Sequence, residues 1–273
     1  MDYDREYFKG KSALVTGGAG GIGLALTEEM LESGAAKVVI ADINQERLDE
    51  SEARFKASFG PDRVKAIICN VTREEEVNSL IAQSSEFFEG SFDLLFNNAG
   101  AAFQGWFDDL STEDWSVAFD LNFYSAVYGM QAVIPIMKAQ GGGQIINIIS
   151  GNAFVPMAWQ CRYAATKAAL NGLSLTLRSE YWDDNIKISS ATPGTTATFI
   201  FADNNKEAPP SAQTPQQSAS RILNGVVNND RIILGDDDDV EGAKYCFHPE
   251  ANKTYDDYLL RVSRERRGGK VAY

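Results

Sequence analysis

Short apolar runs alternate with amphipathic stretches along most of the chain. The first run, 12–16, ends in a cluster of glycines, and helical periodicity follows over 22–33. The later runs are equally short, as expected for strands of a parallel sheet covered on both faces. These runs are KVVIA at 37–41, VKAIIC at 64–69, DLLF at 93–96, QIINII at 144–149, IKISSA at 186–191 and RIIL at 231–234.

Amphipathic segments separate these runs, and their spacing predicts helices at 45–58, 73–88, 112–138, 161–183 and 214–227. Strands that alternate with helices imply right-handed crossovers between parallel strands. We therefore expect an α/β fold with a doubly wound, parallel, seven-stranded, Rossmann-like sheet, in a single domain that spans 1–273.

Two segments depart from this alternation. Residues 195–216 mix aromatic residues with Pro, Asn and Ser, which predicts either a mobile substrate flap or a plain surface loop. The C-terminal extension, 236–273, starts with four aspartates at 236–239 and shows helical character over 253–266. The aspartates lack the alternate-residue spacing and the glycine of a calcium loop, so we expect a solvated turn.

Composition and charge narrow the class of protein. With 273 residues, 44% of them hydrophobic, the chain can bury a full core. Its 25 Lys and Arg against 38 Asp and Glu give a net charge of -13, which would repel nucleic acid and anionic membranes. The charged N-terminus and the lack of an apolar run of about 18 residues favour a cytoplasmic protein. Three scattered cysteines and a single histidine, His248, argue against a disulfide framework, a metal site or a Ser-His-Asp triad.

The glycine cluster, TGGAGGIG at 16–23, lies between the first strand and the first helix. Backbone amides of such a turn, and the positive end of the helix near Ile22, suit the pyrophosphate of a dinucleotide. The cluster fits G-x-G-x-x-G at 18, 20 and 23, T-G-x-x-G-x-x-G at 17, 20 and 23, and T-G-x-x-x-G-x-G at 17, 21 and 23. Spacing alone leaves all three open.

Asp42 ends the second strand, 19 residues after Gly23. A carboxylate at this point can accept hydrogen bonds from an adenosine ribose and would repel a 2'-phosphate. The glycine turn contains no Arg or Lys, and Ile43, Asn44 and Gln45 follow Asp42, so NAD is favoured over NADP. The alternative is that Asp42 caps the helix that starts near Gln45.

Tyr163 and Lys167 are four residues apart on a predicted helix, so both lie on one face. A neighbouring ammonium would lower the phenol pKa from roughly 10, making Tyr163 a candidate general acid or base. Ser150 ends the fifth strand 13 residues earlier and could hydrogen-bond a carbonyl or alcohol oxygen. The same Tyr-x-x-x-Lys spacing recurs at Tyr7 and Lys11, before the first strand, where no cofactor is expected.

Taken together, these residues resemble the short-chain dehydrogenase/reductase family, in its common single-domain branch. The resemblance covers about residues 9–235. Its marks are TGGAGGIG at 16–23, Asp42, NNAG at 97–100, Asn122, Ser150, YAATK at 163–167 and PGTTAT at 193–198.

The resemblance implies a role for each catalytic residue. Tyr163 would transfer the proton and Ser150 would hold the substrate oxygen. Lys167 would bind the nicotinamide ribose and lower the pKa of Tyr163, and Asn122 would support a water that relays the proton to solvent. With the preference that Asp42 indicates, the expected cofactor is NAD.

The resemblance also implies a cofactor site and favours the third glycine spacing. The implied cofactor residues are Gly17, Gly21, Ile22, Gly23, Asp42, Asn70, Val71, Asn98, Ala99, Gly100, Tyr163, Lys167, Pro193, Gly194 and Thr198. Many members have Asp-Val where this chain has Asn70 and Val71, so we expect an altered affinity for adenine rather than a loss of binding.

Large apolar side chains occupy the loops that would wall the substrate pocket, namely Phe103, Trp106, Phe107, Phe154, Met157, Trp159, Phe199 and Phe201. They predict a bulky hydrophobic alcohol or ketone, alicyclic, aromatic or steroid-like, unless they only pack the loops or a subunit contact. Segments 112–138 and 161–183 resemble the helices through which family members form homotetramers or homodimers.

The expected activity is NAD-dependent interconversion of a secondary alcohol and a ketone. The alternatives are an NADP-dependent carbonyl reductase and a non-catalytic dinucleotide sensor.

Overall fold

Seven strands form one parallel sheet in the order β3-β2-β1-β4-β5-β6-β7. The computed structural model describes residues 3–198, 207–246 and 248–269. The strands are β1 (Ser12–Thr16), β2 (Lys37–Asp42), β3 (Val64–Ile68), β4 (Leu94–Asn97), β5 (Gly143–Ile148), β6 (Ile186–Ala191) and β7 (Ile232–Ile233). The predicted doubly wound, seven-stranded parallel sheet is thereby confirmed.

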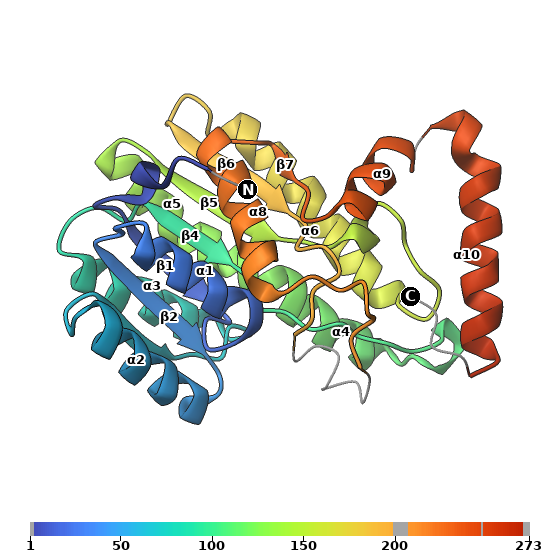
Figure 1. Ribbon diagram of the computed structural model, residues 1–273, viewed down its shortest axis with the longest axis horizontal. Helices are drawn as coiled ribbons and strands as arrows, with labels where there is room; N and C mark the ends of the chain where they lie inside the picture. The colour runs from blue at the N-terminus through green and yellow to red at the C-terminus, as the bar shows by residue number, and fades with distance from the viewer. Residues whose placement is uncertain (1–2, 199–206, 247, 270–273) are drawn as a thin grey trace.

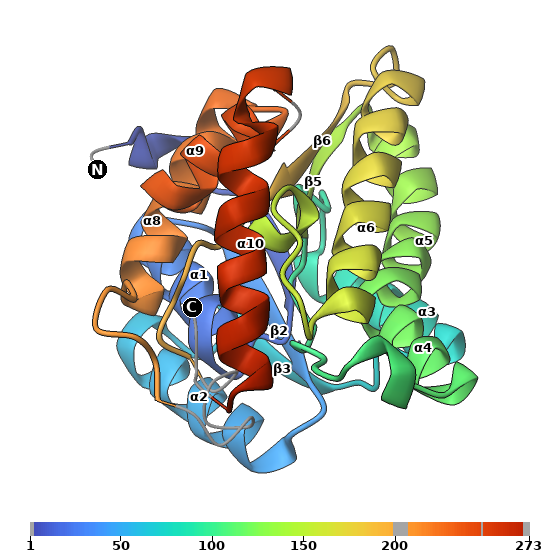
Figure 2. The same cartoon turned by 90° about the vertical axis from the view of Figure 1, so that its right-hand side faces the viewer.

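Helices cover both faces of the sheet (Figures 1 and 2). One face carries α1 (Gly21–Glu32), α2 (Gln45–Phe59) and α8 (Pro215–Asn228), and the other carries α3 (Glu74–Phe88), α5 (Ser125–Gln140) and α6 (Cys161–Glu180). Successive strand residues point to opposite faces. Val38 and Ile40 therefore join the first core with Phe55, while Val39 joins the second.

The strand order of the sheet determines where the ligand crevice lies. β1 pairs with β2 on one side and with β4 on the other, so the crossovers run outward in both directions from this point. In open parallel sheets, ligands bind beyond the carboxyl ends of the strands where the strand order reverses. The residues after β1, β4, β5 and β6 therefore meet at one edge of the sheet.

The helix expected over 112–138 is interrupted, and that prediction is corrected here. α4 (Thr112–Phe119) is followed by a π-helical turn, Asp120–Tyr124, and then by α5. Wide turns of this kind often occur at functional sites. The turn carries the buried side chain of Asn122, which the periodicity of the segment gave no reason to separate from a regular helix.

The aspartate run is also different from the prediction. Asp236 caps α9 (Asp237–Tyr245) by accepting a hydrogen bond from the Asp239 amide, so residues 237–239 form the first turn of a helix rather than a solvated turn. Acidic residues are favourable there because the amino end of a helix carries partial positive charge.

The extension then continues through η5 (Pro249–Ala251) into α10 (Asn252–Arg267), which lies beyond the sheet (Figure 1). The remaining short helices are η1 (Arg5–Phe8), η2 (Phe107–Asp109) and η4 (Gly151–Ala153).

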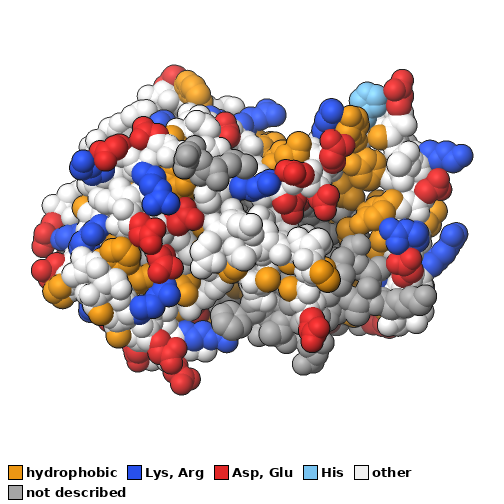
Figure 3. All heavy atoms as spheres, viewed as in Figure 1, with side chains coloured by type: hydrophobic (Ala, Val, Ile, Leu, Met, Phe, Trp, Pro, Cys, Tyr) orange, Lys and Arg blue, Asp and Glu red, His pale blue; other side chains and the backbone are white. Residues whose placement is uncertain are grey.

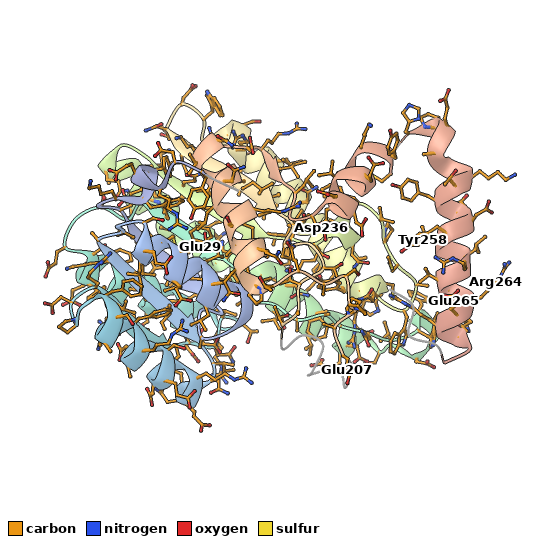
Figure 4. The ribbon with its side chains drawn as sticks, in the orientation of Figure 1. Glu29, Glu207, Asp236, Tyr258, Arg264 and Glu265 are labelled. Atoms are coloured by element: carbon orange, nitrogen blue, oxygen red, sulfur yellow. The ribbon has the colours of Figure 1, made fainter. Side chains whose placement is uncertain are left out.

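α10 packs on loops of its own chain. Val262 is fully buried, and Tyr255 Oη donates to the Glu241 carbonyl at 3.1 Å. Arg266 donates to the Ala158 carbonyl at 2.6 Å, and the Arg267 guanidinium lies 4.2 Å from the centre of the Trp106 ring. Arg264 points away from the body on the opposite side of the helix (Figure 4). The extension thus covers the loops that were expected to wall the substrate pocket.

The segment 195–216 is described at its two ends, and residues 199–206 lie outside the described part. Thr196 and Gln213 form an isolated parallel bridge, with Ala197 N donating to Gln213 O at 2.9 Å. The two ends therefore lie side by side, and the mobile flap stays a prediction. No helix within the described ranges is long and apolar enough to cross a membrane.

Candidate active site

The turn after β1 requires glycine at four positions, and at one of them, Gly18, a β-carbon would lie 2.8 Å from the Val15 carbonyl oxygen. Gly17 (φ +64°) and Gly21 (φ +51°) have left-handed backbones, and a β-carbon on Gly23 would overlap the Gly17 carbonyl oxygen. Gly20, which both of the other spacings need, has an extended backbone that any residue adopts (φ -167°). The two spacings that include Gly20 therefore contain a position with no requirement for glycine, which favours the spacing at 17, 21 and 23.

Thr16 and Asn98 hold this turn against the end of β4. Thr16 Oγ1 accepts from the amides of Asn98 and Ala99, both at 3.1 Å. Asn98 Nδ2 donates to the carbonyls of Thr16 at 2.8 Å and Gly17 at 3.2 Å. Asn98 thus braces the glycine turn, and Thr16 has a positioning role that sequence reasoning left unassigned although it begins the motif.

Asp42 points back at the glycine turn from the end of β2. Its carboxylate accepts from the Ala19 amide at 3.3 Å and from the Asn44 amide at 3.1 Å. The cap of α2 is Asn44, which accepts from the Arg47 amide at 3.0 Å, so the alternative role of Asp42 as the helix cap is wrong. A carboxylate at this place can still accept from a ribose hydroxyl, because each oxygen has a second lone pair.

Asn70 and Val71 follow β3. Asn70 Oδ1 accepts from the Thr72 amide at 3.1 Å and from the Thr72 hydroxyl at 2.8 Å, so the carbonyl of this side chain stabilises its own turn. Val71 is 8% exposed and joins the second core. Contact of either residue with an adenine ring stays a prediction.

α6 carries Tyr163 and Lys167 on one face, and both are buried, at 8% and 4% exposure. The Lys167 ammonium lies 5.9 Å from the centre of the Tyr163 ring and donates to the Ile148 carbonyl at 2.9 Å. Burial lowers the pKa of Lys167 to about 8, because the low-dielectric interior disfavours the charged form.

Burial also raises the pKa of Tyr163, which corrects the expected lowering by Lys167. Desolvation of the phenolate is the largest cause, and the negative charge of Asp239 acts in the same direction. A hydrogen bond from the Ser150 hydroxyl opposes both effects by stabilising the phenolate. Desolvation therefore outweighs any lowering of the Tyr163 pKa by the neighbouring ammonium.

Asn122 connects this helix to the loop after β4. Its Oδ1 accepts from the Ala101 amide at 3.0 Å, and its Nδ2 donates to the Ala101 carbonyl at 3.0 Å and to Thr166 Oγ1 at 3.3 Å. A β-carbon on Gly100 would lie 2.8 Å from Asn122 Oδ1 and 3.2 Å from Lys167 Nζ. The structure therefore brings Gly100, Asn122 and Lys167 into direct proximity.

The segment after β6 forms another wall of the site. Gly194 has a left-handed backbone (φ +70°), and the Pro193 carbonyl accepts from Gln213 Nε2 and from Ser218 Oγ, both at 2.7 Å. Thr198 lies beside the glycine turn, since a β-carbon on Gly21 would be 3.2 Å from Thr198 Cγ2. Half-buried Ile22 packs against the first core at the start of α1.

The predicted aromatic walls are only partly present. Phe107 is 70% exposed and packs on Trp115, while Phe154 is buried in the second core, so neither fits the predicted role. Phe103, Trp106, Met157 and Trp159 are half-buried, and Phe199 and Phe201 lie outside the described residues. Trp159 has φ +70°, a conformation that costs energy for a bulky residue and is found mostly at functional loops.

Asp239 is the main site residue that sequence reasoning missed. It lies close enough to Tyr163 to raise the pKa of the phenol, although it comes from the extension. Its position among four identical residues gave no signal that one of them turns inward.

Comparisons with known proteins agree on one family. A family model described as short chain dehydrogenase matches residues 11–209. A 3alpha-hydroxysteroid dehydrogenase of Mediterraneibacter gnavus is 34% identical over 194 residues, which are 71% of this chain and 77% of that protein.

Solved structures are similar over most of their length. A short-chain dehydrogenase from Novosphingobium aromaticivorans has a TM-score of 0.79 and 26% identity, covering 96% of this chain and 95% of the other. L-Sorbose reductase from Gluconobacter frateurii, solved with NADPH and L-sorbose, has a TM-score of 0.76 and 28% identity, covering 84% and 95%.

Proposed function

The chain belongs to the short-chain dehydrogenase family of oxidoreductases, and from that premise we propose that it interconverts a secondary alcohol and a ketone with NAD. The observation that carries the proposal is the convergence of Ser150, Tyr163, Lys167 and Asn122 beside the glycine turn. These residues come from three different elements, and only the tertiary fold brings them together.

The residues present fit a nicotinamide dinucleotide. The glycine turn leaves no room for a β-carbon at Gly23, and α1 directs its amino end at the same place, which suits a pyrophosphate. Gly17, Gly21, Ile22 and Gly23 would hold it there. Asp42 would bind the adenosine ribose.

The remaining cofactor contacts follow the two walls of the site. On the adenosine side we propose Asn70, Val71, Asn98, Ala99 and Gly100. On the nicotinamide side we propose Pro193, Gly194 and Thr198, together with Tyr163 and Lys167. When bound, the dinucleotide supplies the hydride acceptor, which is the part of the chemistry that protein side chains do not provide.

Tyr163 takes the hydroxyl proton of the alcohol through its Oη. The Ser150 hydroxyl, which hydrogen-bonds Tyr163 in the structure, would donate its single proton to the reacting oxygen when the substrate is bound. Lys167, held by the Ile148 carbonyl, would bind the nicotinamide ribose and take part in the proton path. Asn122 fixes the loop at Ala101 and supports a water that carries the proton to solvent. In the direction of reduction, Tyr163 donates the proton.

For the substrate we propose a bulky hydrophobic body, alicyclic, aromatic or steroid-like. The half-buried Phe103, Trp106, Met157 and Trp159 on the loops near Tyr163 support this choice. The 3alpha-hydroxysteroid dehydrogenase among the relatives acts on an alicyclic alcohol of this kind.

We also propose a homotetramer or homodimer built through α4, α5 and α6. Val117 on α4 and Tyr124 in the π-helical turn before α5 support this, because they leave large apolar groups exposed, at 45% and 43%. Sedimentation equilibrium would measure the assembly, and a monomer at micromolar concentration would contradict it.

The test is absorbance of the reduced nicotinamide with NAD or NADP against a panel of alicyclic, aromatic and steroid alcohols. We expect turnover with NAD that disappears in Tyr163→Phe. Turnover with NADP alone would support the alternative, an NADP-dependent carbonyl reductase. This alternative is considered because the similar L-sorbose reductase was solved with NADPH. A dinucleotide sensor would bind NAD by calorimetry and keep its binding-linked output in Tyr163→Phe.

A further inference from the structure

A carboxylate from the C-terminal extension lies in the candidate active site. α9 begins directly after β7 and carries Asp239 in its first turn. A β-carbon on Gly151 would overlap Asp239 Oδ1, so the carboxylate lies against the residue that follows Ser150. Its charge also acts on Tyr163. Asp239 therefore flanks the two groups that would hold the reacting oxygen.

Asp236 fixes this position. Its Oδ1 accepts from the Asp239 amide at 2.8 Å, and its Oδ2 accepts from the Thr195 amide at 2.7 Å. Figure 4 shows Asp236 at the start of α9. Further along the helix, a β-carbon on Gly242 would lie 2.9 Å from Val155 Cγ2, so α9 also packs closely on the loop between Ser150 and Tyr163.

One oxygen of the carboxylate is left without a partner. Asp239 Oδ2 is buried and has no hydrogen-bond partner among the described residues. A buried acceptor without a donor is costly, and native structures keep few of them without a functional reason. The other acidic side chains of the run differ in this respect, since Asp237 and Asp238 are exposed and Asp237 pairs with Arg221 at 3.1 Å.

The electrostatics agree with this geometry. Desolvation raises the pKa of Asp239 to about 6 and the charge of Asp236 adds to the rise. Hydrogen bonding to the carboxylate from Thr192 and Gly194 opposes the rise but leaves Oδ2 unsatisfied. At neutral pH the group is still mostly ionised and is a strong acceptor. Arg162, the nearest arginine to Tyr163 in sequence, is already paired with Asp114 at 3.0 Å.

We propose that Asp239 is a specificity-determining residue that accepts a hydrogen bond from a second hydroxyl group, next to the carbon that is oxidised. The substrate class is then a vicinal diol and its product an α-hydroxyketone, on the hydrophobic body proposed above. This inference rests on the proposed function, because it needs the reacting oxygen between Ser150 and Tyr163. Asp239 would also repel a substrate that carries a carboxylate in place of the second hydroxyl group.

The half-buried surroundings of the site agree with such a mixed substrate. Hydrophobic side chains gather between α9 and α10 on the face shown in Figure 3, with the acidic side chains of the extension beside them. A body that packs on apolar groups and presents a diol to Asp239 satisfies both kinds of surface.

The experiment compares two substrates of equal ring size, cyclohexanol and cyclohexane-1,2-diol, in the wild type, Asp239→Asn and the control Asp238→Asn. We expect the wild type to favour the diol in kcat/KM by about 10- to 100-fold, since a site built for a hydroxyl discriminates strongly against its absence. Asp239→Asn should lose most of this preference, measured as the ratio of the two kcat/KM values rather than as the rate with either alcohol alone. Asp238→Asn, exposed on the same turn, should keep it.

The ratio of kcat/KM for the diol to kcat/KM for cyclohexanol separates recognition of the second hydroxyl group from the chemical step. Both substrates depend on Tyr163, so a change in the pKa of Tyr163 cancels in the ratio. If Asp239→Asn lowers kcat/KM equally for both substrates, or weakens the calorimetric affinity for NAD, then Asp239 only holds Thr192 and Gly194 in place. Either result would overturn the inference. Equal rates with the two alcohols in the wild type would do the same. A wild type that oxidises neither alcohol, nor any of the wider panel, would overturn the proposed function itself.

Discussion

The chain contains two Tyr-x-x-x-Lys sequences, and the fold treats them differently. Tyr7 lies in η1 near the amino ends of the strands, with Lys11 4.8 Å from its ring centre. Tyr163 and Lys167 lie on α6 near the carboxyl ends. The pKa of each tyrosine is raised, mainly by burial. Spacing and burial alone therefore do not distinguish the two pairs.

Their partners do distinguish them. Tyr7 Oη donates to Gln144 Oε1 at 2.7 Å, and Gln144 Nε2 donates to the Val226 carbonyl at 3.0 Å. These hydrogen bonds connect η1 with β5 and α8, so Tyr7 has a structural role. Tyr163 is hydrogen-bonded by Ser150 and lies beside Asp239, at the edge of the sheet where the glycine turn and Asn122 also lie. The two pairs share spacing and the direction of the pKa shift but differ in their surroundings, and we propose a catalytic role only for the pair near the carboxyl ends of the strands.

Exchanging each tyrosine for phenylalanine should give the largest contrast. Tyr163→Phe removes the proton-transferring group, and we expect kcat to fall by about 10³-fold or more. Tyr7→Phe should leave kcat within about twofold but lower the free energy of unfolding by about 1 kcal/mol, because one partly buried hydrogen bond is lost. Steady-state kinetics and urea unfolding measure the two effects. A comparable loss of kcat in Tyr7→Phe would contradict the assignment.

The lysines provide a second contrast. Lys167→Met should lower kcat by about 10²-fold, while Lys11→Met should have little effect. Stability gives an independent measurement. The pKa of Lys167 is about 8 in the fold and 10.5 in an unfolded chain, so between these values the unfolded state binds more protons. The wild type should therefore gain stability as pH rises from about 8 to 10.5, relative to Lys167→Met. Parallel stability curves for the two proteins would contradict this expectation.

Substitution of Asp42 tests whether the adenosine ribose binds at the edge of the sheet formed by the carboxyl ends of the strands. Asp42→Ala removes the acceptor and the repulsion of a 2'-phosphate, so we expect the KM ratio of NAD to NADP to rise by about tenfold. Glu46→Ala, at an exposed position in the first turn of α2, is the matched control. An unchanged ratio in Asp42→Ala would place cofactor choice elsewhere.

The smallest expected effect is a shift in pH dependence. The charge of Asp239 raises the pKa of Tyr163, so Asp239→Asn should lower that pKa. Alcohol oxidation needs the deprotonated phenol, and its rise with pH should therefore move to lower pH, by less than about one unit. Tyr7 provides the internal comparison, because Asp93 rather than Asp239 raises its pKa. A shift to higher pH would show that Asp239 does not act on Tyr163 through its charge.

Much of the fold could be predicted because it depends on local patterns. The seven apolar runs become the seven strands, with boundaries that differ by at most one residue, since short continuous apolar runs mark strands that are buried on both faces. The glycine turn was also visible, because positions with left-handed backbone favour glycine whatever surrounds them. The π-helical turn at Asn122 was not visible, because it depends on hydrogen bonds to Ala101, 21 residues away.

The sequence by itself determined the parallel sheet, the family and the identity of the residues at the candidate site, since hydrophobic periodicity and spaced motifs depend on near neighbours along the chain. Only the tertiary structure decided the direction of the Tyr163 pKa shift, the bracing role of Asn98 and the place of Asp239. Burial and charge are sums over neighbours in space. Asp239 lies 76 residues from Tyr163 in the chain and beside it in the fold, and no local pattern contains that contact.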